Sequence, residues 1–195
     1  IAAATTGKVT ATLDPTTTIN AATVAALKDV KATDAITFAP TTDTGLDGKD
    51  ELNALLAIKK LIPNADFSKI VTIDADAKDV ALVKSVLKDV AANVAVTITD
   101  DISAADANAI AKATTGVVTA TLKDGSVAAT LKALTNVDTN DVLTFKTTDK
   151  TVKATELVAL DKLIDTFDAL NVTTVTGDAK DTADIATALA ITTIT

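Results

Sequence analysis

Short runs in which apolar and β-branched residues alternate with threonine recur along the whole chain. They predict strands at residues 9–13, 35–38, 70–73, 94–98, 117–122, 142–145, 172–175 and 191–194. In most of these runs a threonine stands between two apolar residues, as in Val9-Thr10-Ala11. Because successive side chains of a strand point to opposite faces, one face of each strand is apolar and the other carries hydroxyl groups.

Between these strands, apolar residues recur at the three- and four-residue spacing of an amphipathic helix. Leu52, Leu55 and Ile62 show this spacing clearly. The pattern predicts helices at residues 21–30, 49–62, 78–90, 104–113, 127–134, 154–167 and 182–190. Strand–helix–strand units that recur in this way predict parallel strands joined by right-handed crossovers.

The chain contains two copies of one unit. Residues 1–13 and 110–122 are identical at 11 of 13 positions. Further matches follow in the same order, with small gaps, between 34–38 and 141–145, 60–62 and 162–164, and 76–79 and 178–181. We therefore divide the chain into a first copy at 1–109 and a second copy at 110–195. Each holds four strand–helix units, shorter in the second copy, and the two copies are expected to form one continuous array.

The start of the second copy falls inside a predicted helix. Ser103 is placed to cap this helix, with Asp106 three residues further on in a variant of the capping box. The first copy starts at the equivalent Ile1, without the cap and the first turn. We therefore expect the chain to be a segment of a longer array.

Two architectures fit an alternation of parallel strands and helices. In a right-handed α/β solenoid, similar in rhythm to a leucine-rich repeat, the strands form one parallel sheet in sequence order with helices on one flank. In a doubly wound parallel α/β sheet, helices cover both faces and the strands are near-continuous apolar runs. The threonine inside most predicted strands favours the solenoid, and the doubly wound sheet remains the alternative.

Composition excludes several functional classes. The 195 residues include no His, Cys, Trp or Tyr, all 18 basic residues are Lys, and the net charge is −8. Zinc sites of the usual kind, thiol nucleophiles and Ser–His relays therefore lack their residues. A strongly acidic chain without arginine is also unsuited to nucleic acid. No apolar run approaches the roughly 18–20 residues that span a bilayer.

The segments TTGVVTATL, SAADANAIAKA and DTADIATALA carry a resemblance to known proteins. The chain resembles a repeat unit of very large Ala/Thr/Asp-rich secreted or cell-surface proteins of cyanobacteria and proteobacteria, which are adhesin-like or surface-layer-like. The resemblance covers most of both copies and implies an extracellular, structural role. The glycine-rich calcium repeat GGxGxD that often accompanies such units is absent from this sequence.

The central threonines of the predicted strands form the first candidate site. If the strands stack in register, one sheet face carries a row of hydroxyl groups. Such a row suits a contact face between copies, or a surface for glycan or ice, and threonine is also an ordinary solvent-facing strand residue. The row consists of Thr10, Thr37, Thr72, Thr97, Thr119 and Thr144.

An acidic loop forms the second candidate site. Asp43, Asp47, Asp50 and Glu51 lie close together in the sequence and offer carboxylate oxygens of the kind that Ca²⁺ prefers. The spacing departs from that of an EF-hand loop. Asp50 and Glu51 also suit the first turn of a helix, where they complement its dipole. Calcium is therefore the single cofactor considered, and no other is expected.

These observations together predict a structural protein rather than an enzyme. A carboxylate pair for glycoside hydrolysis needs a cleft lined by aromatic residues, and the four phenylalanines fall in core-like positions. We expect a segment of a bacterial extracellular filament, surface layer or adhesin stalk, whose partners are further copies of itself or neighbouring repeats. A binding module for glycan, ice or calcium, using the threonine face or the acidic loop, is the alternative.

Overall fold

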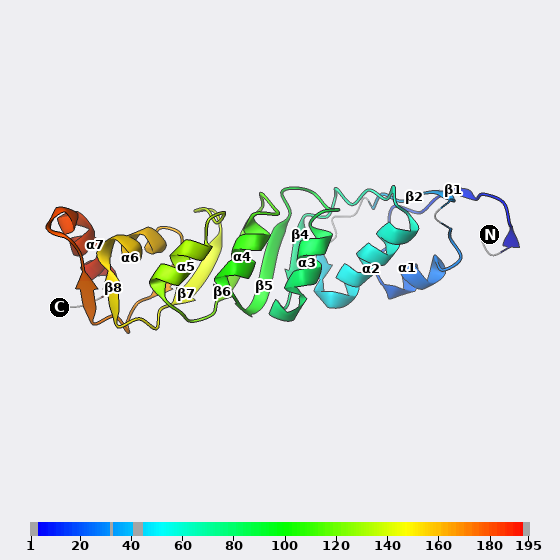
Figure 1. The fold of residues 1–195 in the computed structure, drawn as a ribbon. Helices are drawn as coiled ribbons and strands as arrows, with labels where there is room; N and C mark the ends of the chain where they lie inside the picture. Colours follow the sequence, from blue (N-terminus) through cyan, green and yellow to red (C-terminus); the bar gives the residue numbers. More distant parts are fainter. Residues whose placement is uncertain (1–3, 32, 41–44, 193–195) are drawn as a thin grey trace. The chain divides into compact units, whose positions relative to one another are not determined.

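The computed structural model describes residues 4–31, 33–40 and 45–192 and has a mixed α/β fold (Figure 1). Its helices are α1 (Ala21–Ala26), α2 (Gly48–Leu61), α3 (Val80–Val86), α4 (Ala104–Ala111), α5 (Val127–Ala133), α6 (Ala154–Asp161) and α7 (Thr182–Thr192). Each of them lies within a helix that the sequence pattern predicts or extends it by one or two residues. The α/β class is therefore confirmed.

Short strands alternate with these helices. They are β1 (Thr10–Thr12), β2 (Ala35–Thr37), β3 (Leu46–Asp47), β4 (Thr72–Ala75), β5 (Ala95–Ile102), β6 (Val118–Leu122), β7 (Val142–Lys146), β8 (Thr151–Lys153), β9 (Thr166–Asp168) and β10 (Thr174–Thr176). Six of them form a parallel sheet in the order β3-β4-β5-β6-β7-β9. Two further parallel pairs are β1-β2 and β10-β8.

The chain divides into two compact units whose boundary differs from that of the sequence copies. Unit 1 comprises residues 1–97 and 113–116, and unit 2 comprises 98–112 and 117–195. The division falls inside β5, so this strand contributes residues to both units.

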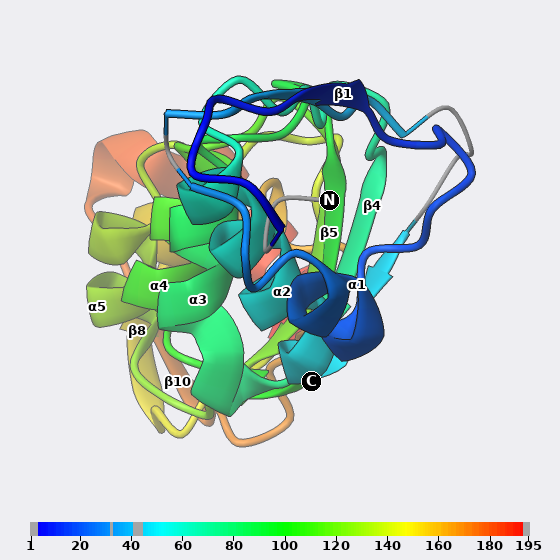
Figure 2. The ribbon, with the colours of Figure 1, turned by 90° about the vertical axis from the view of Figure 1, so that its right-hand side faces the viewer.

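Within unit 1, β3 pairs with β4 and β1 with β2. Helix α2 packs on α1 and α3, and Figure 2 shows α2 and α3 on the same side of β4. Helix α2 carries Asp50 and Glu51 in its first turn and Lys59 and Lys60 in its last turn, charges that match the two ends of the helix dipole. It buries its apolar face completely, at Leu52, Leu55 and Ile58.

Within unit 2, β6, β7 and β9 pair in sequence order, and β8 pairs with β10. Helix α5 packs on α4 and α6, and α6 packs on α7. The predicted cap of α4 is confirmed. The Ser103 hydroxyl oxygen accepts the Asp106 N–H at 3.1 Å, and the hydroxyl donates to the Asp106 carboxylate at 2.8 Å.

The four phenylalanines form one ring contact in each unit. In unit 1 the rings of Phe38 and Phe67 meet edge to face with centroids 6.0 Å apart. In unit 2 the rings of Phe145 and Phe167 stack with centroids 5.7 Å apart. Phe38 and Phe145 occupy matching positions of the repeat, but their partners Phe67 and Phe167 do not, so each copy packs its matching ring against a phenylalanine from a different position.

Two predictions of the sequence pattern are wrong at the level of single elements, and three strands are missing from it. The helix predicted at 154–167 ends at Asp161, because Phe167 lies in strand β9 opposite Phe145. Ile191 and Thr192, predicted as the start of a strand, belong to helix α7, and residues 193–195 lie outside the described residues. Strands β3, β8 and β9 were not predicted.

Two predicted strands, now β4 and β10, begin later than expected. In both places the chain first makes a turn that buries an aliphatic residue. The Ile70 N–H donates to the Phe67 carbonyl, and the Val172 N–H donates to the Ala169 carbonyl, both at 3.0 Å. Ile70 and Val172 are buried in turns, so their apolar character indicated the core but not the strand.

Candidate functional site

The parallel pairings join equivalent segments of consecutive strand–helix units. Thr10 pairs with Ala35, Leu46 with Ile73, and Thr144 with Thr166. The isolated bridges, Phe67 with Val90 and Gly125 with Thr147, follow the same rule. Each strand therefore pairs with the corresponding part of the next unit.

This register changes the predicted threonine row. Thr37 lies opposite Thr12 rather than Thr10, with 2.9 Å between the two hydroxyl oxygens. Thr10 lies opposite Ala35. The residue opposite Thr37 is therefore two positions further along the neighbouring strand than the predicted row requires. A shift of two keeps each side chain on its face of the sheet, and Thr10, Thr37 and Thr72 are exposed.

In unit 2 the register brings three threonines into line. Thr144 lies opposite Thr121 on one side and opposite Thr166 on the other. Thr121 and Thr166 are exposed, and Thr144 is half-buried. Thr119 lies opposite Val142 and is half-buried, as is Thr97 in β5. Thr121 and Thr166 were not among the predicted residues, because the sequence does not show the offset between neighbouring strands.

The acidic loop is divided by the start of α2. Asp43 lies outside the described residues. Asp47 precedes the helix, and its backbone N–H donates to the Glu51 carboxylate at 2.8 Å. Asp50 and Glu51 stand in the first helical turn. Among the described residues, no three carboxylates gather in the manner of a metal site, and the placement of Asp50 and Glu51 fits their helix-dipole role.

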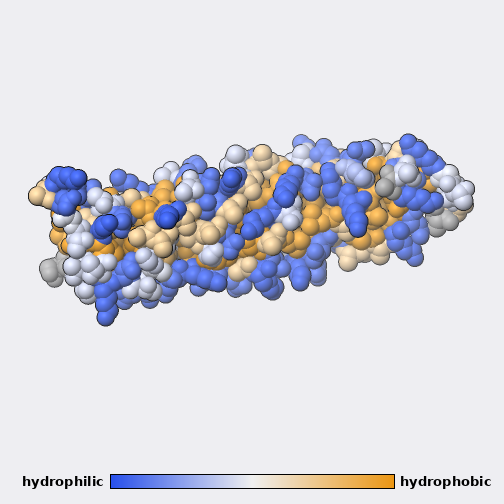
Figure 3. All heavy atoms as spheres, viewed as in Figure 1, coloured by the Kyte–Doolittle hydropathy of each residue, from blue (hydrophilic) through white to orange (hydrophobic). Residues whose placement is uncertain are grey.

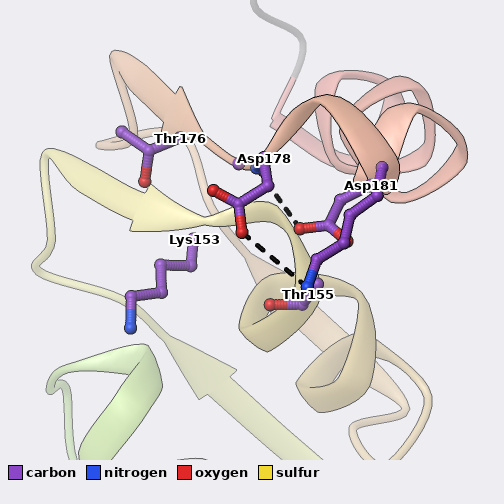
Figure 4. A pocket seen from close by; sticks show the side chains of 7 residues that line it. Lys153, Thr155, Thr176, Asp178 and Asp181 are labelled. Atoms are coloured by element: carbon purple, nitrogen blue, oxygen red, sulfur yellow. Dashed lines mark hydrogen bonds and ion pairs between the residues drawn. The ribbon is translucent and has the colours of Figure 1, made fainter.

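An open hollow of about 510 Å³ in unit 2 is lined by Lys153, Thr155, Thr176, Asp178 and Asp181, among others (Figure 4). Its charges interact with one another and with the backbone. The Asp178 N–H donates to the Asp181 carboxylate at 3.3 Å, and the Lys180 ammonium lies 4.0 Å from the Asp178 carboxylate. Because Asp178 and Asp181 form a capping box, the hollow is the surface of a helix start.

Another hollow, of about 330 Å³ in unit 1, lies between α1 and α2. Ala21, Val24, Ala54 and Ala57 form most of its lining. Figure 3 shows apolar side chains (orange) beside hydrophilic ones (blue) over these helices. Small side chains allow close approach of another surface, and Asp50 and Asn53 of α2 contribute the polar side chains of the lining.

One aspartate in each copy links two successive strand–helix units through backbone hydrogen bonds. The Asp34 carboxylate accepts the N–H groups of Val9 and Lys31, both at 2.9 Å. The matching Asp141 accepts the N–H groups of Val118, at 2.8 Å, and Asp138, at 3.1 Å. The two backbone donors, Lys31 and Val9, hold the pKa of the Asp34 carboxyl below its ordinary value. These aspartates therefore position the strands and are not free for ligands.

The Thr-Thr-Gly turn, which both copies contain, has the same internal hydrogen bond in each of them. The Gly7 N–H donates to the Thr5 hydroxyl oxygen at 3.1 Å, and the Gly116 N–H donates to the Thr114 hydroxyl oxygen at 2.9 Å. The identity of residues 5–7 with 114–116 was the signal that pointed to it.

Comparison with known proteins adds no further assignment: no family model, curated protein or solved structure matches the chain. Within the described part of the chain, no helix has the length and apolar character that crossing a membrane requires.

Proposed function

We propose that this chain is a structural, non-enzymatic repeat segment of a bacterial extracellular filament, surface layer or adhesin stalk, and that it works by self-association. Its partners would be further copies of itself or neighbouring repeats of the same chain. The resemblance to large Ala/Thr/Asp-rich surface proteins supports the extracellular setting. The absence of His, Cys and Arg supports a non-catalytic role.

The observation that carries the proposal is the uniform parallel pairing of each strand with the next unit of the repeat. Thr10 pairs with Ala35, Thr119 with Val142, and Thr151 with Thr174, each pair joining consecutive units. Strand order in the largest sheet follows the sequence. A doubly wound sheet reverses its strand order at a switch point, so sequential order favours a right-handed α/β solenoid of leucine-rich-repeat type.

A solenoid suits a structural role for a physical reason. Each unit of a solenoid contacts its sequence neighbours, and its apolar surfaces are covered when the next unit stacks on it. Stability therefore accumulates by adding units, and the array lengthens without a new fold. The same property leaves strand edges and core surface at the ends, which further units of the same kind can cover.

Electron microscopy of the material purified from its source, with and without a calcium chelator, tests this proposal. We expect fibres or lattices whose axial repeat matches one or two copies of the unit. Loss of the assemblies on chelation would assign a structural role to calcium. Discrete monomeric particles in both conditions would contradict the filament and surface-layer forms of the proposal.

A binding module is the second candidate, and the line of Thr121, Thr144 and Thr166 favours it. Three hydroxyl groups on adjacent strands are spaced by the strand separation, about 4.8 Å, and can meet a regular ligand such as a glycan chain or ice. Glycan-array binding and ice-recrystallisation assays test this candidate. Replacement of Thr144 by Val, which removes the hydroxyl and keeps the shape, would abolish binding if the row is the site.

A further inference from the structure

Asn171, Val172 and Thr173 form the one Asn-x-Thr or Asn-x-Ser sequence among the eight asparagines of the chain. Such a sequence accepts an N-linked sugar when it lies in a surface loop of an exported protein. The strand predicted at 172–175 would have placed Asn171 at the entry of a sheet strand. In the structure β10 begins at Thr174, and Asn171 is an exposed residue of the turn between β9 and β10.

The turn that holds Asn171 has a counterpart in the middle of the chain. Residues 162–181 align with residues 60–79 without a gap. In both segments the N–H two residues after an aspartate donates to that carboxylate, at 2.9 Å in the first copy and 3.0 Å in the second. Asn171 corresponds to Lys69, which is exposed although strand–helix units precede and follow it. The exposure of this turn is therefore a property of the repeat unit.

The fold tolerates a sugar on the side chain of Asn171. The Asn171 amide nitrogen donates to the Thr147 carbonyl oxygen at 3.0 Å. A primary amide has two N–H groups, and this hydrogen bond uses one of them. Attachment of a sugar replaces the other hydrogen atom. The turn therefore keeps its contact with Thr147, which is 0% exposed, when Asn171 is modified.

Thr173 supplies the hydroxyl group that completes the acceptor sequence. It is exposed, and its hydroxyl lies 3.2 Å from the Lys150 carbonyl oxygen. This distance is longer than that of an ordinary O–H···O hydrogen bond. The hydroxyl is thus held weakly on the surface, where a modifying enzyme reaches it together with Asn171.

The residue before Asn171 is an exposed leucine. Leu170 is the most exposed of the large apolar residues in the described part of the chain, at 74%. At the matching position the first copy has the polar Ser68, which is also exposed. A single exposed leucine is ordinary, but this one stands in the copy that carries the acceptor sequence. A sugar presents C–H groups as well as hydroxyls, so a sugar on Asn171 would cover Leu170.

We propose that Asn171 carries an N-linked sugar, added by a separate transferase from a glycosyl diphosphate. This proposal rests on the extracellular setting of the proposed function and deepens it by naming a surface modification. In the transfer, the Asn171 amide nitrogen forms a bond to the anomeric carbon of the sugar. The bond from that carbon to the diphosphate oxygen breaks, the diphosphate leaves with the electron pair, and an amide proton passes to a base of the transferase.

Mass spectrometry of the chain purified from its source tests the proposal. A protease that cuts after lysine releases residues 163–180, and fragmentation that preserves the sugar bond assigns the added mass to one residue. We expect the chain in the cell-surface fraction to carry one or more sugar residues on Asn171. Asn64, an exposed asparagine outside any such sequence, should carry none.

Variants produced in the source organism separate the acceptor sequence from its surroundings. Asn171→Gln and Thr173→Val should each lose the sugar completely, whereas Thr173→Ser should keep it. Thr174→Val, one residue beyond the sequence, is the matched control and should keep it as well. The double variant Lys69→Asn with Val71→Thr builds the same sequence on the matching turn of the first copy and should gain a sugar at position 69. Circular dichroism spectra that match the unmodified chain confirm that the variants are folded.

Four results would overturn the proposal. An unmodified Asn171 in chain recovered from the cell surface would remove the sugar and leave the proposed function standing. Sugar found on threonines of residues 163–180 and not on Asn171 would do the same. A chain that is unmodified and absent from the surface fraction would remove the extracellular setting as well. Sugar on Asn171 without sugar at position 69 of the folded double variant would contradict the exposed turn as the acceptor.

Discussion

The strand–helix unit of β4 and α3 and that of β10 and α7 have the same local structure and different burial. Each consists of a short strand, a one-turn 3-10 helix and a helix, at matching positions of the two copies. Ile73 is fully buried and Val175 is half-buried; Asp79 is 6% exposed and Asp181 is half-buried. Local sequence therefore determines the path of the chain, while neighbouring units determine how much apolar surface leaves water.

This difference has an energetic meaning. Burial of apolar surface contributes about 25 cal/mol per Å², so the same side chain stabilises an enclosed unit more than an end unit. Matched substitutions at equivalent positions of the two copies measure this directly. If the account is right, the copy with the more enclosed residue should lose more stability in each pair.

The largest difference is expected for the two phenylalanines whose rings contact the matching Phe38 and Phe145, although positions 67 and 167 are not aligned in the two copies. Phe67 is 1% exposed and Phe167 is half-buried. Phe67→Ala should lower the free energy of unfolding by about 3–5 kcal/mol, and Phe167→Ala should cost clearly less, because part of its ring is already in water. Urea denaturation followed by circular dichroism measures both. Equal losses would show that the two positions are equally enclosed in solution.

The second largest difference in stability is expected for the glycines of the two Thr-Thr-Gly turns. Gly116→Val forces a side chain against the Ala92–Val94 backbone and should cost about 1–3 kcal/mol or more. Gly7→Val meets no such backbone among the residues that the structure describes, and it should change the stability of the monomer by less than about 0.5 kcal/mol. Thermal unfolding at low protein concentration compares them. A loss for Gly7→Val as large as that for Gly116→Val would mean that the first turn is already covered in the monomer.

The two aspartates that link successive units give a smaller difference. Asp141 is 9% exposed and accepts two backbone N–H groups. Asp141→Ala leaves these donors without their acceptor and should cost about 1–3 kcal/mol. Asp34→Ala should cost less, because water reaches its half-buried surroundings. Unfolding in urea at neutral pH measures both, and a larger loss for Asp34→Ala would reverse the comparison.

The smallest effect is the pH dependence that Asp34 contributes. Hydrogen bonds from the N–H groups of Lys31 and Val9 lower the pKa of its carboxyl in the folded state. The folded protein therefore releases this proton more readily than the unfolded chain, whose aspartates have a pKa of about 3.9. Asp34 stabilises the fold fully above that pH and loses this contribution as the pH falls through the folded pKa.

Asp34→Asn tests the sign of this effect. The difference in unfolding free energy between the unmodified chain and Asp34→Asn should be largest near pH 7 and shrink as the pH falls below about 4. Measuring urea unfolding at several pH values between neutrality and the acid range gives the difference. A difference that grows toward low pH would contradict the assignment of the two hydrogen bonds.

Much of the fold was predictable because the sequence repeats. The matches between residues 1–13 and 110–122 and between 34–38 and 141–145 indicated the duplicated strands. The α/β class and the described helices followed from hydrophobic spacing. Short strands were harder to foresee. Strand β3 has two residues and leads directly into α2. Two residues are too few to show an alternation of apolar and polar side chains.

Tertiary contacts explain most of the remaining errors. The spacing of Leu157, Leu160 and Ile164 continues a helical pattern past Asp161, yet Phe167 stacks on Phe145 and pairs with it in the sheet. The β-branched Ile191 and Thr192 suggest a strand but extend α7. A helix already started at Thr182 adds further residues at little cost, which outweighs the weak strand preference of two residues.

The sequence predicted that threonines lie on the outward strand face, but it did not predict which threonines lie opposite one another. Threonines on the outward strand face were foreseen, yet the line of Thr121, Thr144 and Thr166 depends on how each strand is offset from the next. These offsets depend on the turns between strands and helices. The Thr-Thr-Gly turn was visible in the alignment, but its role became clear when the structure placed Val94 against Gly116.

Hydrogen exchange at two matching amides tests the central claim most directly. The Thr115 N–H donates to the Ala92 carbonyl, so it should be protected at every protein concentration. The equivalent Thr6 is exposed, and its N–H should exchange much faster than that of Thr115 in the dilute chain. This result would support the claim that neighbouring strand–helix units, and not the local sequence of the turn, determine how far each copy is enclosed. Equal protection of the two amides would contradict the account.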